Sequence, residues 1–322
     1  MGATARAQPN IALVKYWGKR DTARNLPAVG SISITLDDLY TEMRVDLDGD
    51  LDGDLDRLRV NGEDSPDLLP RVAACLDTVL GADRPRASVS SGSNFPLAAG
   101  LASSASSFAA LVVAASAAAG LSRTTAELAG LAGRASGSAA RSLYGGFVEL
   151  RNDADDIVVN SILDREAWPL RIVAAVTEPG AKPIGSGEAM EISRKSSPFY
   201  SRWVEEQPMD LATARDAIAV RDFGKLASVA EHNCLKMHSV MWASRPPVVY
   251  WNPATLDCLQ AVRELQSDGV AVFFTIDAGP QVKAVCLPDV EARVVETLSQ
   301  VAGVQAVHTS AIGCGAMLVS GG

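Results

Sequence analysis

Apolar positions along the chain follow two periods, which together predict a mixture of strands and helices. Short alternating runs, of which SISITL at Ser31–Leu36 is the clearest, indicate strands because successive side chains of a strand point to opposite faces. Longer runs with apolar residues three or four positions apart, as in Phe223–Met241, indicate helices with one buried face. Strands are predicted at Ala12–Val14, Ser31–Leu36, Tyr40–Val45, Leu58–Val60, Ala87–Ser90, Gly145–Leu150, Leu170–Val176, Val270–Ile276, Gln305–Thr309 and Ala316–Ser320. Helices are predicted at Pro66–Leu80, Ser106–Ala119, Thr124–Ala135, Ser196–Glu206, Asp210–Val220, Phe223–Met241, Pro253–Asp268 and Asp289–Leu298.

The order of these elements favours an α+β fold, because strands and helices are mixed without the strict alternation of a parallel α/β sheet. A length of 322 residues allows about two domains. The Gly- and Pro-rich segment Glu178–Gly187 (EPGAKPIGSG) is the predicted boundary, since such segments interrupt regular structure. We therefore expect an N-terminal domain at residues 1–182 and a C-terminal domain at residues 183–322.

Composition and charge exclude several classes of function. The formal net charge of −9 disfavours a nucleic-acid partner, and it means that an anionic substrate must be attracted by a local basic cluster. No apolar run reaches the length of about 18 residues that a bilayer requires, so no membrane span is predicted. The five cysteines are scattered without metal-ligand spacing, which is typical of reduced thiols in a cytoplasmic protein.

Two features raise the question of a metal site. Alternating aspartates in Asp46–Asp56 (DLDGDLDGDLD) are the right ligand type for calcium, but the closing Glu of an EF-hand loop is missing. Asp-Gly is also a common hairpin-turn signal, so we favour a solvated hairpin tip over a calcium site. His232 and His238 lie six positions apart on a predicted helix, a spacing that disfavours shared ligation, and we interpret them as ordinary helix residues.

The segment Asn94–Ala105 (NFPLAAGLASSA) is the most informative motif of the chain. Small residues at Ala98–Gly100 precede Leu101, and Ser103 and Ser104 lead into an Ala-rich run that predicts a helix. Such a loop lets an anion approach the unpaired backbone N–H groups at the positive end of the helix dipole. The hydroxyl groups add hydrogen bonds, and one is able to ligate Mg²⁺. A Ser-capped helix start among alanines explains the same residues, and the pattern alone leaves the two hypotheses even.

Three charged residues stand at positions that suit a binding cleft. Asp277 follows an apolar predicted strand and precedes Ala-Gly-Pro, although Asp commonly opens such turns and the spacing alone favours that structural role. Arg141 follows Ser136 and Ser138, and its planar guanidinium suits a bound carboxylate or phosphate as well as a structural ion pair. Lys15 directly follows an apolar strand, a position that favours a side chain directed into a site more than that of an ordinary surface lysine.

The loop and further segments resemble those of one enzyme family. The order Pro, small residues, Gly-Leu, one residue and Ser-Ser-Ala at Pro96–Ala105 is similar to the phosphate loop of kinases that act on galactose, homoserine, mevalonate and phosphomevalonate. Four other segments look like those of the diphosphomevalonate decarboxylases: PNIALVKYWGKRD (Pro9–Asp21), SGSAARSLYGGFVEL (Ser136–Leu150), RPPVVYW (Arg245–Trp251) and FFTIDAGPQVK (Phe273–Lys283). Because these segments occur in order over nearly the whole length, the chain is identified as similar to that family.

The resemblance implies a fold, a reaction and cofactors. The expected fold joins an N-terminal domain like the second domain of ribosomal protein S5 to a ferredoxin-like C-terminal domain, with a cleft between them. The expected reaction is the ATP-dependent decarboxylation of 5-diphosphomevalonate to isopentenyl diphosphate, with CO₂, ADP and phosphate as the other products and Mg²⁺ as cofactor. The resemblance also implies a homodimer.

The family resemblance also implies roles for the residues at matching positions. Asp277 is expected to orient and deprotonate the substrate's 3-hydroxyl group, Arg141 to bind the carboxylate and phosphate side of the substrate close to Asp277, and Lys15 to neutralise phosphate charge. Further substrate contacts are implied for Tyr16, Lys19, Ser136, Ser138, Ser186 and Met190, with Asn10 near the reacting groups. ATP contacts are implied for Pro96, Ala99, Gly100, Leu101, Ser103 and Ser104, and Ser104 is the candidate Mg²⁺ ligand.

The chain departs from the family pattern at several positions. Gly185 stands where members often carry a second Ser, Gly187 where some bacterial members carry Arg, and Ala-Val-Gly within Leu26–Ser33 replaces a more polar stretch. Each change removes a polar contact, which leaves the number of substrate phosphates open. The alternatives are therefore decarboxylation of 5-phosphomevalonate to isopentenyl phosphate, or a kinase that phosphorylates the 3-hydroxyl group and stops. A nucleotide-binding regulator without turnover is disfavoured because the residues that carry the chemistry are all present.

Overall fold

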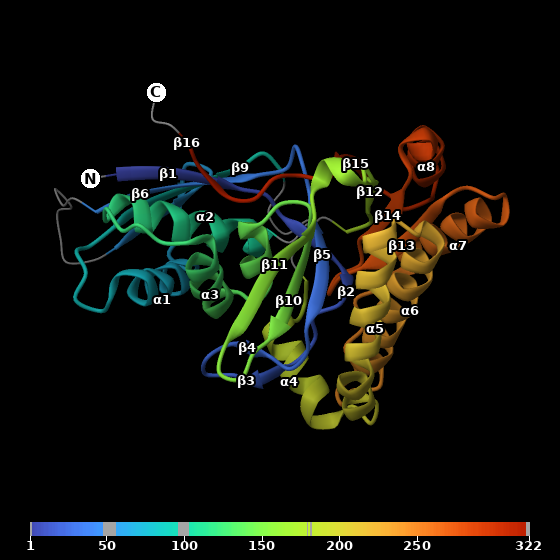
Figure 1. The fold of residues 1–322 in the computed structure, drawn as a ribbon, viewed down its shortest axis with the longest axis horizontal. Coiled ribbons are helices and arrows are strands. Elements are labelled where there is room, and N and C mark those ends of the chain that lie inside the picture. Colours follow the sequence, from blue (N-terminus) through green and yellow to red (C-terminus); the bar gives the residue numbers. More distant parts are fainter. Residues whose placement is uncertain (1, 48–55, 96–102, 179, 181, 320–322) are drawn as a thin grey trace.

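A computed structural model describes residues 2–47, 56–95, 103–178, 180 and 182–319, which form three larger sheets flanked by helices (Figure 1). The strands are β1 (Gly2–Ala7), β2 (Asn10–Val14), β3 (Lys19–Asp21), β4 (Leu26–Pro27), β5 (Ser31–Thr35), β6 (Thr41–Asp46), β7 (Arg57–Val60), β8 (Glu63–Asp64), β9 (Ser88–Ser93), β10 (Phe147–Asn152), β11 (Ile157–Leu163), β12 (Arg171–Val176), β13 (Val272–Ile276), β14 (Val282–Cys286), β15 (Ala306–Ala311) and β16 (Met317–Val319). The helices are α1 (Leu69–Leu80), α2 (Ser103–Ala118), α3 (Thr125–Ala135), the 3-10 helix η1 (Ala139–Leu143), α4 (Ser186–Ser196), α5 (Tyr200–Val220), α6 (Phe223–Trp242), α7 (Pro253–Ser267) and α8 (Glu291–Ser299).

The first sheet lies at the end of the molecule that carries both chain termini (Figure 1). Its strand order is β16-β1-β6-β9-β7-β8, so the last strand of the chain pairs with the first. Helices α1, α2 and α3 lie together beneath this sheet, and α2 packs against β1 and β6 (Figure 1). The buried Ala-rich face of α2 allows this close approach, because small side chains let the helix backbone come near the sheet.

The other two sheets meet under helices α5 and α6. The second sheet has the order β11-β10-β5-β2, and the third has the order β13-β14-β12-β15. A single apolar cluster joins them, and it includes Ile11 from β2, Leu211 from α5, Leu226 from α6 and Phe273 from β13. The Thr275 hydroxyl also donates to Ala12 O over 3.1 Å. The ends of β2 and β13, which lie at opposite ends of the sequence, are therefore brought together.

The predicted α+β class is confirmed, and most predicted elements occur within a few residues of their expected ends. Helix α3 follows Thr124, whose side chain forms a capping box with Glu127. The prediction of two helices at Ser196–Glu206 and Asp210–Val220 is wrong, because α5 continues through Pro208 as one helix. The predicted elements do not include helix α4 or strands β1, β3, β4, β8, β11 and β14. The boundary after residue 182 stays a prediction, although β12, which precedes it, already belongs to the third sheet.

The acidic stretch lies mostly outside the described residues. At its two ends, Asp46 pairs with Arg44 over 2.6 Å, and Asp56 pairs with the buried Arg84 over 2.6 Å. In the ranges that the structure covers, no helix combines the length and the apolar character needed to cross a membrane.

Candidate active site

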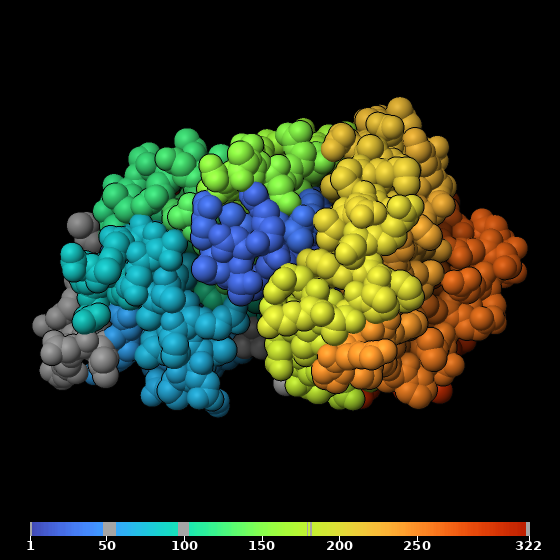
Figure 2. Space-filling view, turned by 90° about the horizontal axis from the view of Figure 1, so that it is seen from below, coloured from blue at the N-terminus to red at the C-terminus, as the bar shows by residue number. Residues whose placement is uncertain are grey.

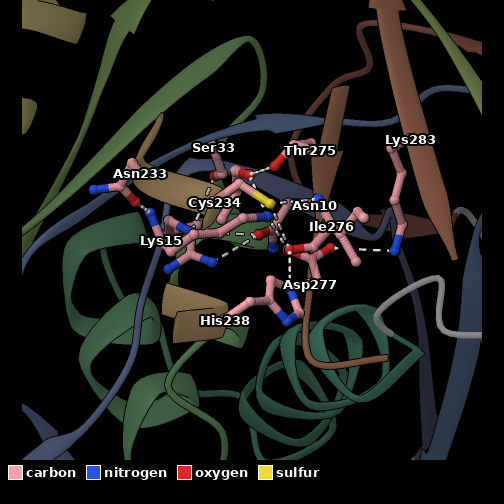
Figure 3. Close-up of polar contacts among 12 residues, drawn as sticks. Asn10, Lys15, Ser33, Asn233, Cys234, His238, Thr275, Ile276, Asp277 and Lys283 are labelled. Carbon is pink, nitrogen blue, oxygen red and sulfur yellow. Dashed lines mark hydrogen bonds and ion pairs between the residues drawn. The ribbon is translucent and has the colours of Figure 1, made fainter. Parts of the chain in front are cut away.

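Asp277 follows β13, and two buried lysines contact its carboxylate (Figure 3). A hydrogen bond from Gly279 N to Asp277 O (2.7 Å) closes the turn after the strand. Lys15 Nζ lies 2.7 Å from Oδ1, and Lys283 Nζ lies 3.5 Å from Oδ2. Both lysine side chains are 1% exposed, whereas the Asp277 side chain is 28% exposed. The Asp277 side chain therefore remains partly accessible while two cations balance its charge.

Burial and charge act in opposite directions on this carboxyl group. Burial raises the pKa of Asp277, but the charges and hydrogen bonds of Lys15 and Lys283 outweigh it and hold the pKa well below its usual range. Burial lowers the pKa of Lys283, and the Asp277 charge opposes that change. Asp277 is therefore ionised at neutral pH, and it is a good hydrogen-bond acceptor but a weak base.

Arg141 lies on η1 and is 2% exposed. Its guanidinium donates to Asn10 Oδ1 (3.1 and 3.3 Å), Ser31 Oγ (2.7 Å) and Ser33 Oγ (3.0 Å), which are all neutral acceptors. Among the residues that the structure describes, no carboxylate lies within ion-pair distance of it. Burial lowers the pKa of Arg141 to about 10, and the Asp277 charge opposes this. A buried cation held only by neutral groups is suited to an anionic ligand.

The loop before η1 packs against Tyr16. Ser136 and Ser138 lie on either side of Gly137, with their hydroxyl oxygens 3.3 Å apart. A Cβ atom at Gly137 would come within 2.5 Å of Tyr16 Oη, so a side chain at this position requires the tyrosine ring to move. The Tyr16 hydroxyl is buried without a hydrogen-bond partner in the described part of the chain, and burial raises its pKa to about 12. The structure thus brings Tyr16, Ser136 and Ser138 together with Arg141.

Lys19 lies further out, at the start of β3. Burial lowers the pKa of Lys19, and the Arg71 charge on α1 adds to this, while Glu191 opposes it. A Cβ atom at Gly187 on α4 would lie 3.8 Å from Lys19 Nζ, so an arginine at this position would begin beside this ammonium. Figure 2 shows a hollow between α1 and α4 with β3 at its rim. The charged groups around Lys19 therefore surround an opening at the surface.

The predicted contacts on α4 differ from each other in their surroundings. Ser186 is the first residue of α4, and its hydroxyl accepts a hydrogen bond from Lys182 Nζ over 2.8 Å. The same ammonium donates to Ala278 O, next to Asp277, over 2.9 Å. Met190 is buried in an apolar cluster that also holds Trp17 and Trp203. Ser186 thus lies near the Asp277 turn, whereas Met190 contributes packing beneath it.

Packing explains two of the other sequence departures, Gly30 and Val29, but nothing in the structure explains Gly185. A Cβ atom at Gly30 would lie 2.8 Å from both Leu150 O and Leu211 Cδ1, so a larger residue does not fit there without a shift. Val29 is buried within the apolar cluster of Trp17 and Met190. A Cβ atom at Gly185 would meet nothing within 4 Å.

The predicted phosphate loop is described only at its end. Pro96, Ala99, Gly100 and Leu101 lie outside the described residues, as does most of the loop. Ser103 and Ser104 are the first residues of α2, and Ser104 is exposed there. No cluster of three or more His, Cys, Asp or Glu side chains suits a metal among the residues with described positions. An exposed hydroxyl at a helix start fits Mg²⁺, which prefers oxygen ligands and is commonly held by substrate phosphates with few protein ligands.

Sequence reasoning missed three residues around Asp277. Lys283 was quoted only as part of a motif, although a lysine inside the apolar strand VKAVC is itself a signal, since buried lysines are rare without a partner. Lys182 lies in a segment interpreted only as a domain boundary. His238 was interpreted as an ordinary helix residue, yet it is fully buried with Nε2 3.2 Å from Ile276 O, and burial lowers its pKa to about 3.

Comparisons with known proteins agree with this geometry. A model of the diphosphomevalonate decarboxylase-like N-terminal domain matches residues 7–161, and one of the mevalonate 5-diphosphate decarboxylase C-terminal domain matches residues 172–314. The diphosphomevalonate decarboxylase of Candida albicans is 36% identical over 299 residues, covering 86% of this chain and 82% of that protein.

Solved structures are similar over almost the whole chain. Mevalonate diphosphate decarboxylase from Staphylococcus aureus superimposes with a TM-score of 0.91 at 35% identity, covering 99% of this chain and 98% of that one. MDDEF in complex with MVAPP, AMPPCP and magnesium also gives a TM-score of 0.91, at 33% identity and 99% coverage of both chains. The chain therefore belongs to the diphosphomevalonate decarboxylase family.

Proposed function

We propose that this chain catalyses the ATP-dependent decarboxylation of 5-diphosphomevalonate to isopentenyl diphosphate, with release of CO₂, ADP and phosphate. The observation that carries the proposal is an ionised Asp277 in the same site as a buried Arg141 that only neutral groups contact among the described residues. The substrate carries a hydroxyl group that suits Asp277 and a carboxylate that suits Arg141. Family membership and the MVAPP- and AMPPCP-bound relative support this assignment.

The first step is phosphoryl transfer to the 3-hydroxyl group. Asp277 accepts a hydrogen bond from this hydroxyl and directs its oxygen at the γ-phosphorus of ATP. The oxygen forms the new P–O bond as the bond to ADP breaks, and the proton passes to Asp277 late, since a carboxylate of low pKa is a weak base. Bound Mg²⁺ neutralises charge on the ATP phosphates, and Ser104 is the described residue suited to hold it.

The second step breaks the bond between the carboxylate carbon and C2. The 3-phosphate leaves with the electron pair of its bond to C3, and the electrons of the breaking C–C bond form the new double bond between C2 and C3. Arg141 holds the carboxylate in one orientation until CO₂ forms, because its guanidinium is itself fixed by Asn10, Ser31 and Ser33. We assign the remaining polar contacts to Tyr16, Ser136 and Ser138, which lie beside this guanidinium.

The charges around Lys19 favour a substrate with phosphates at the outer end of the site. Lys19 interacts with Arg71, a second cation, and Ser186 lies nearby on α4. Gly187 leaves this end with less positive charge than relatives that carry arginine there. That observation keeps 5-phosphomevalonate, which carries one phosphate fewer, as the alternative substrate.

We further propose that the enzyme works as a cytoplasmic homodimer. The family resemblance supports the dimer. The five free cysteines, of which four are buried, support a reducing compartment.

The test supplies purified protein and Mg-ATP with mevalonate, 5-phosphomevalonate or 5-diphosphomevalonate, and follows ADP and CO₂ together. Equal amounts of ADP and CO₂ with the diphosphate alone are expected. The same result with the monophosphate alone would establish the alternative substrate. ADP without CO₂ would mean a 3-hydroxyl kinase and would remove the role of Arg141.

A further inference from the structure

Lys15 has an unusual backbone environment for a residue so close to the reacting groups. Strand β2 ends at Val14, so the backbone N–H and C=O of Lys15 lie beyond the hydrogen-bond ladder of the sheet. The residue is nevertheless 1% exposed. Buried backbone groups outside a ladder need other partners, because an unpaired polar group away from water is costly. The side chains of α5 and α6 supply them.

Two buried amides hold the Lys15 backbone from both sides. Lys15 N donates to Asn233 Oδ1 over 2.7 Å, and Gln207 Nε2 donates to Lys15 O over 2.6 Å. Asn233 Nδ2 donates to Gln207 Oε1 over 2.9 Å, which ties the two amides together. Gln207 and Asn233 are 1% and 0% exposed. Figure 3 shows the amide of Asn233 turned toward Lys15.

The clamp is anchored further out by charge. Asn233 Nδ2 also donates to Asp210 Oδ2 over 2.6 Å, and Lys236 Nζ contacts the same oxygen over 2.6 Å. Gln207 Nε2 additionally lies 3.2 Å from Gly30 O. These hydrogen bonds fix the orientation of both amides. Turning either amide over would place an oxygen against an acceptor or an NH₂ group against a donor elsewhere in the network.

We propose that Gln207 and Asn233 are positioning residues, which set the place of the Lys15 ammonium against Asp277 and so tune the reaction from the helices of the C-terminal half. The Lys15 side chain leaves a backbone fixed at both N and O, and its Nζ then reaches Ala12 O (2.9 Å) and Asp277 Oδ1 (2.7 Å). A shift of the backbone moves the ammonium away from the carboxylate. This inference rests on the proposed function.

The test variant is Gln207→Met, which keeps the length of the side chain and removes its hydrogen bonds. The Lys15 carbonyl loses its donor, so the ammonium loosens and the pKa of Asp277 rises toward its ordinary value. The protonated, inactive form of Asp277 then extends to higher pH, and the acid limb of the kcat/KM profile moves upward. We expect kcat to fall by about 10- to 100-fold, the scale for displacing a positioned group by about 1 Å, with the KM for ATP unchanged.

Several charged or titratable groups near Asp277 could also affect the pH dependence of kcat/KM, so each of them must be compared with the substituted position. The groups that interact with the Asp277 charge are Lys15, Lys283, Arg141, Lys182, His238 and Cys234. The substitution at Gln207 removes a partner of Lys15 alone among these. Titration of the Asp277 carboxyl by NMR gives the same readout without turnover. The inference and the proposed reaction can therefore fail separately.

The matched control is Trp203→Phe on the same helix. Trp203 is 2% exposed, and its Nε1 donates to Trp17 O over 3.0 Å, so it holds the same segment two residues beyond Lys15. We expect the control to lower the melting temperature while the acid limb and the Asp277 titration stay as in the wild type. Should Gln207→Met fail to fold, Gln207→Asn keeps the amide but withdraws it by one methylene group, and the same shift is expected. An unchanged acid limb in the folded Gln207 variant, or an equal shift in the control, would overturn the proposal.

Discussion

Lys283 supplies the second cation of Asp277, and Lys283→Met removes it with little change in volume. The Nζ–Oδ2 distance of 3.5 Å gives a Coulomb energy of about 5 kcal/mol at an effective dielectric constant of about 20, and of about 1 kcal/mol in water. Because the Asp277 side chain is 28% exposed, the true value lies between these limits. Even the lower limit corresponds to about a fivefold change in the protonation equilibrium.

The direction in which Lys283 shifts the pKa of Asp277 determines how the substitution changes the pH dependence of activity. Lys283 lowers the pKa of Asp277, so its removal raises that pKa, and activity is lost at a higher pH as the solution is acidified. The assay measures kcat/KM from ADP and CO₂ release between acid and mildly alkaline pH. Lys225→Met is the matched control, since Lys225 pairs with Asp216 over 3.9 Å at an exposed site. An acid limb that stays in place, or moves to lower pH, would refute the assigned electrostatics.

The remaining predictions concern the reacting groups and the outer end of the site. Asp277→Asn should abolish turnover and leave ATP binding measurable by calorimetry; near-normal turnover would exclude the hydroxyl-orienting role. Arg141→Ala should reduce kcat by orders of magnitude, whereas a rise in KM alone would make Arg141 a uniform binder of substrate. Gly187→Arg places a further cation, besides Arg71, near Lys19 and should lower the KM for the diphosphate substrate; an unchanged KM would count against Lys19 as a phosphate contact.

Local sequence patterns predicted those elements of the fold whose own residues determine them. The helix predicted at Thr124–Ala135 and the alternating β5 strand are examples, because their signals lie within a few residues. Helix α5 was divided at Pro208, which lacks the N–H for its place in the helix. Buried Trp203 and Leu211 on either side of it pack into different clusters, and this tertiary packing outweighs the local penalty. Strand β1 (GATARA) has weak intrinsic preference and depends on pairing with β6 and β16.

The candidate site likewise contains residues that the sequence indicates and residues that only the fold brings together. The family resemblance selected Asp277, Arg141 and Lys15 as candidates, because they stand at positions that match its motifs, whereas the spacing around Asp277 alone favours a structural turn. Lys283 and Asn233 were not predicted, because their importance arises from strands and helices that approach one another only in the folded chain. A lysine in a buried strand was the one local signal available for Lys283.

The charge of the site explains how a protein of net charge −9 binds an anionic substrate. The overall field repels such a ligand, so attraction must come from cations at short range. Arg141 shows how the fold maintains one: Asn10, Ser31 and Ser33 satisfy its hydrogen bonds, and no carboxylate of the described residues forms an ion pair with it. A carboxylate at any of these three positions would stabilise the buried guanidinium more strongly, yet it would also occupy the place that we propose for the substrate carboxylate. In the proposed mechanism, the neutral acceptors therefore sacrifice some stability of the free enzyme, and the substrate carboxylate completes the ion pair.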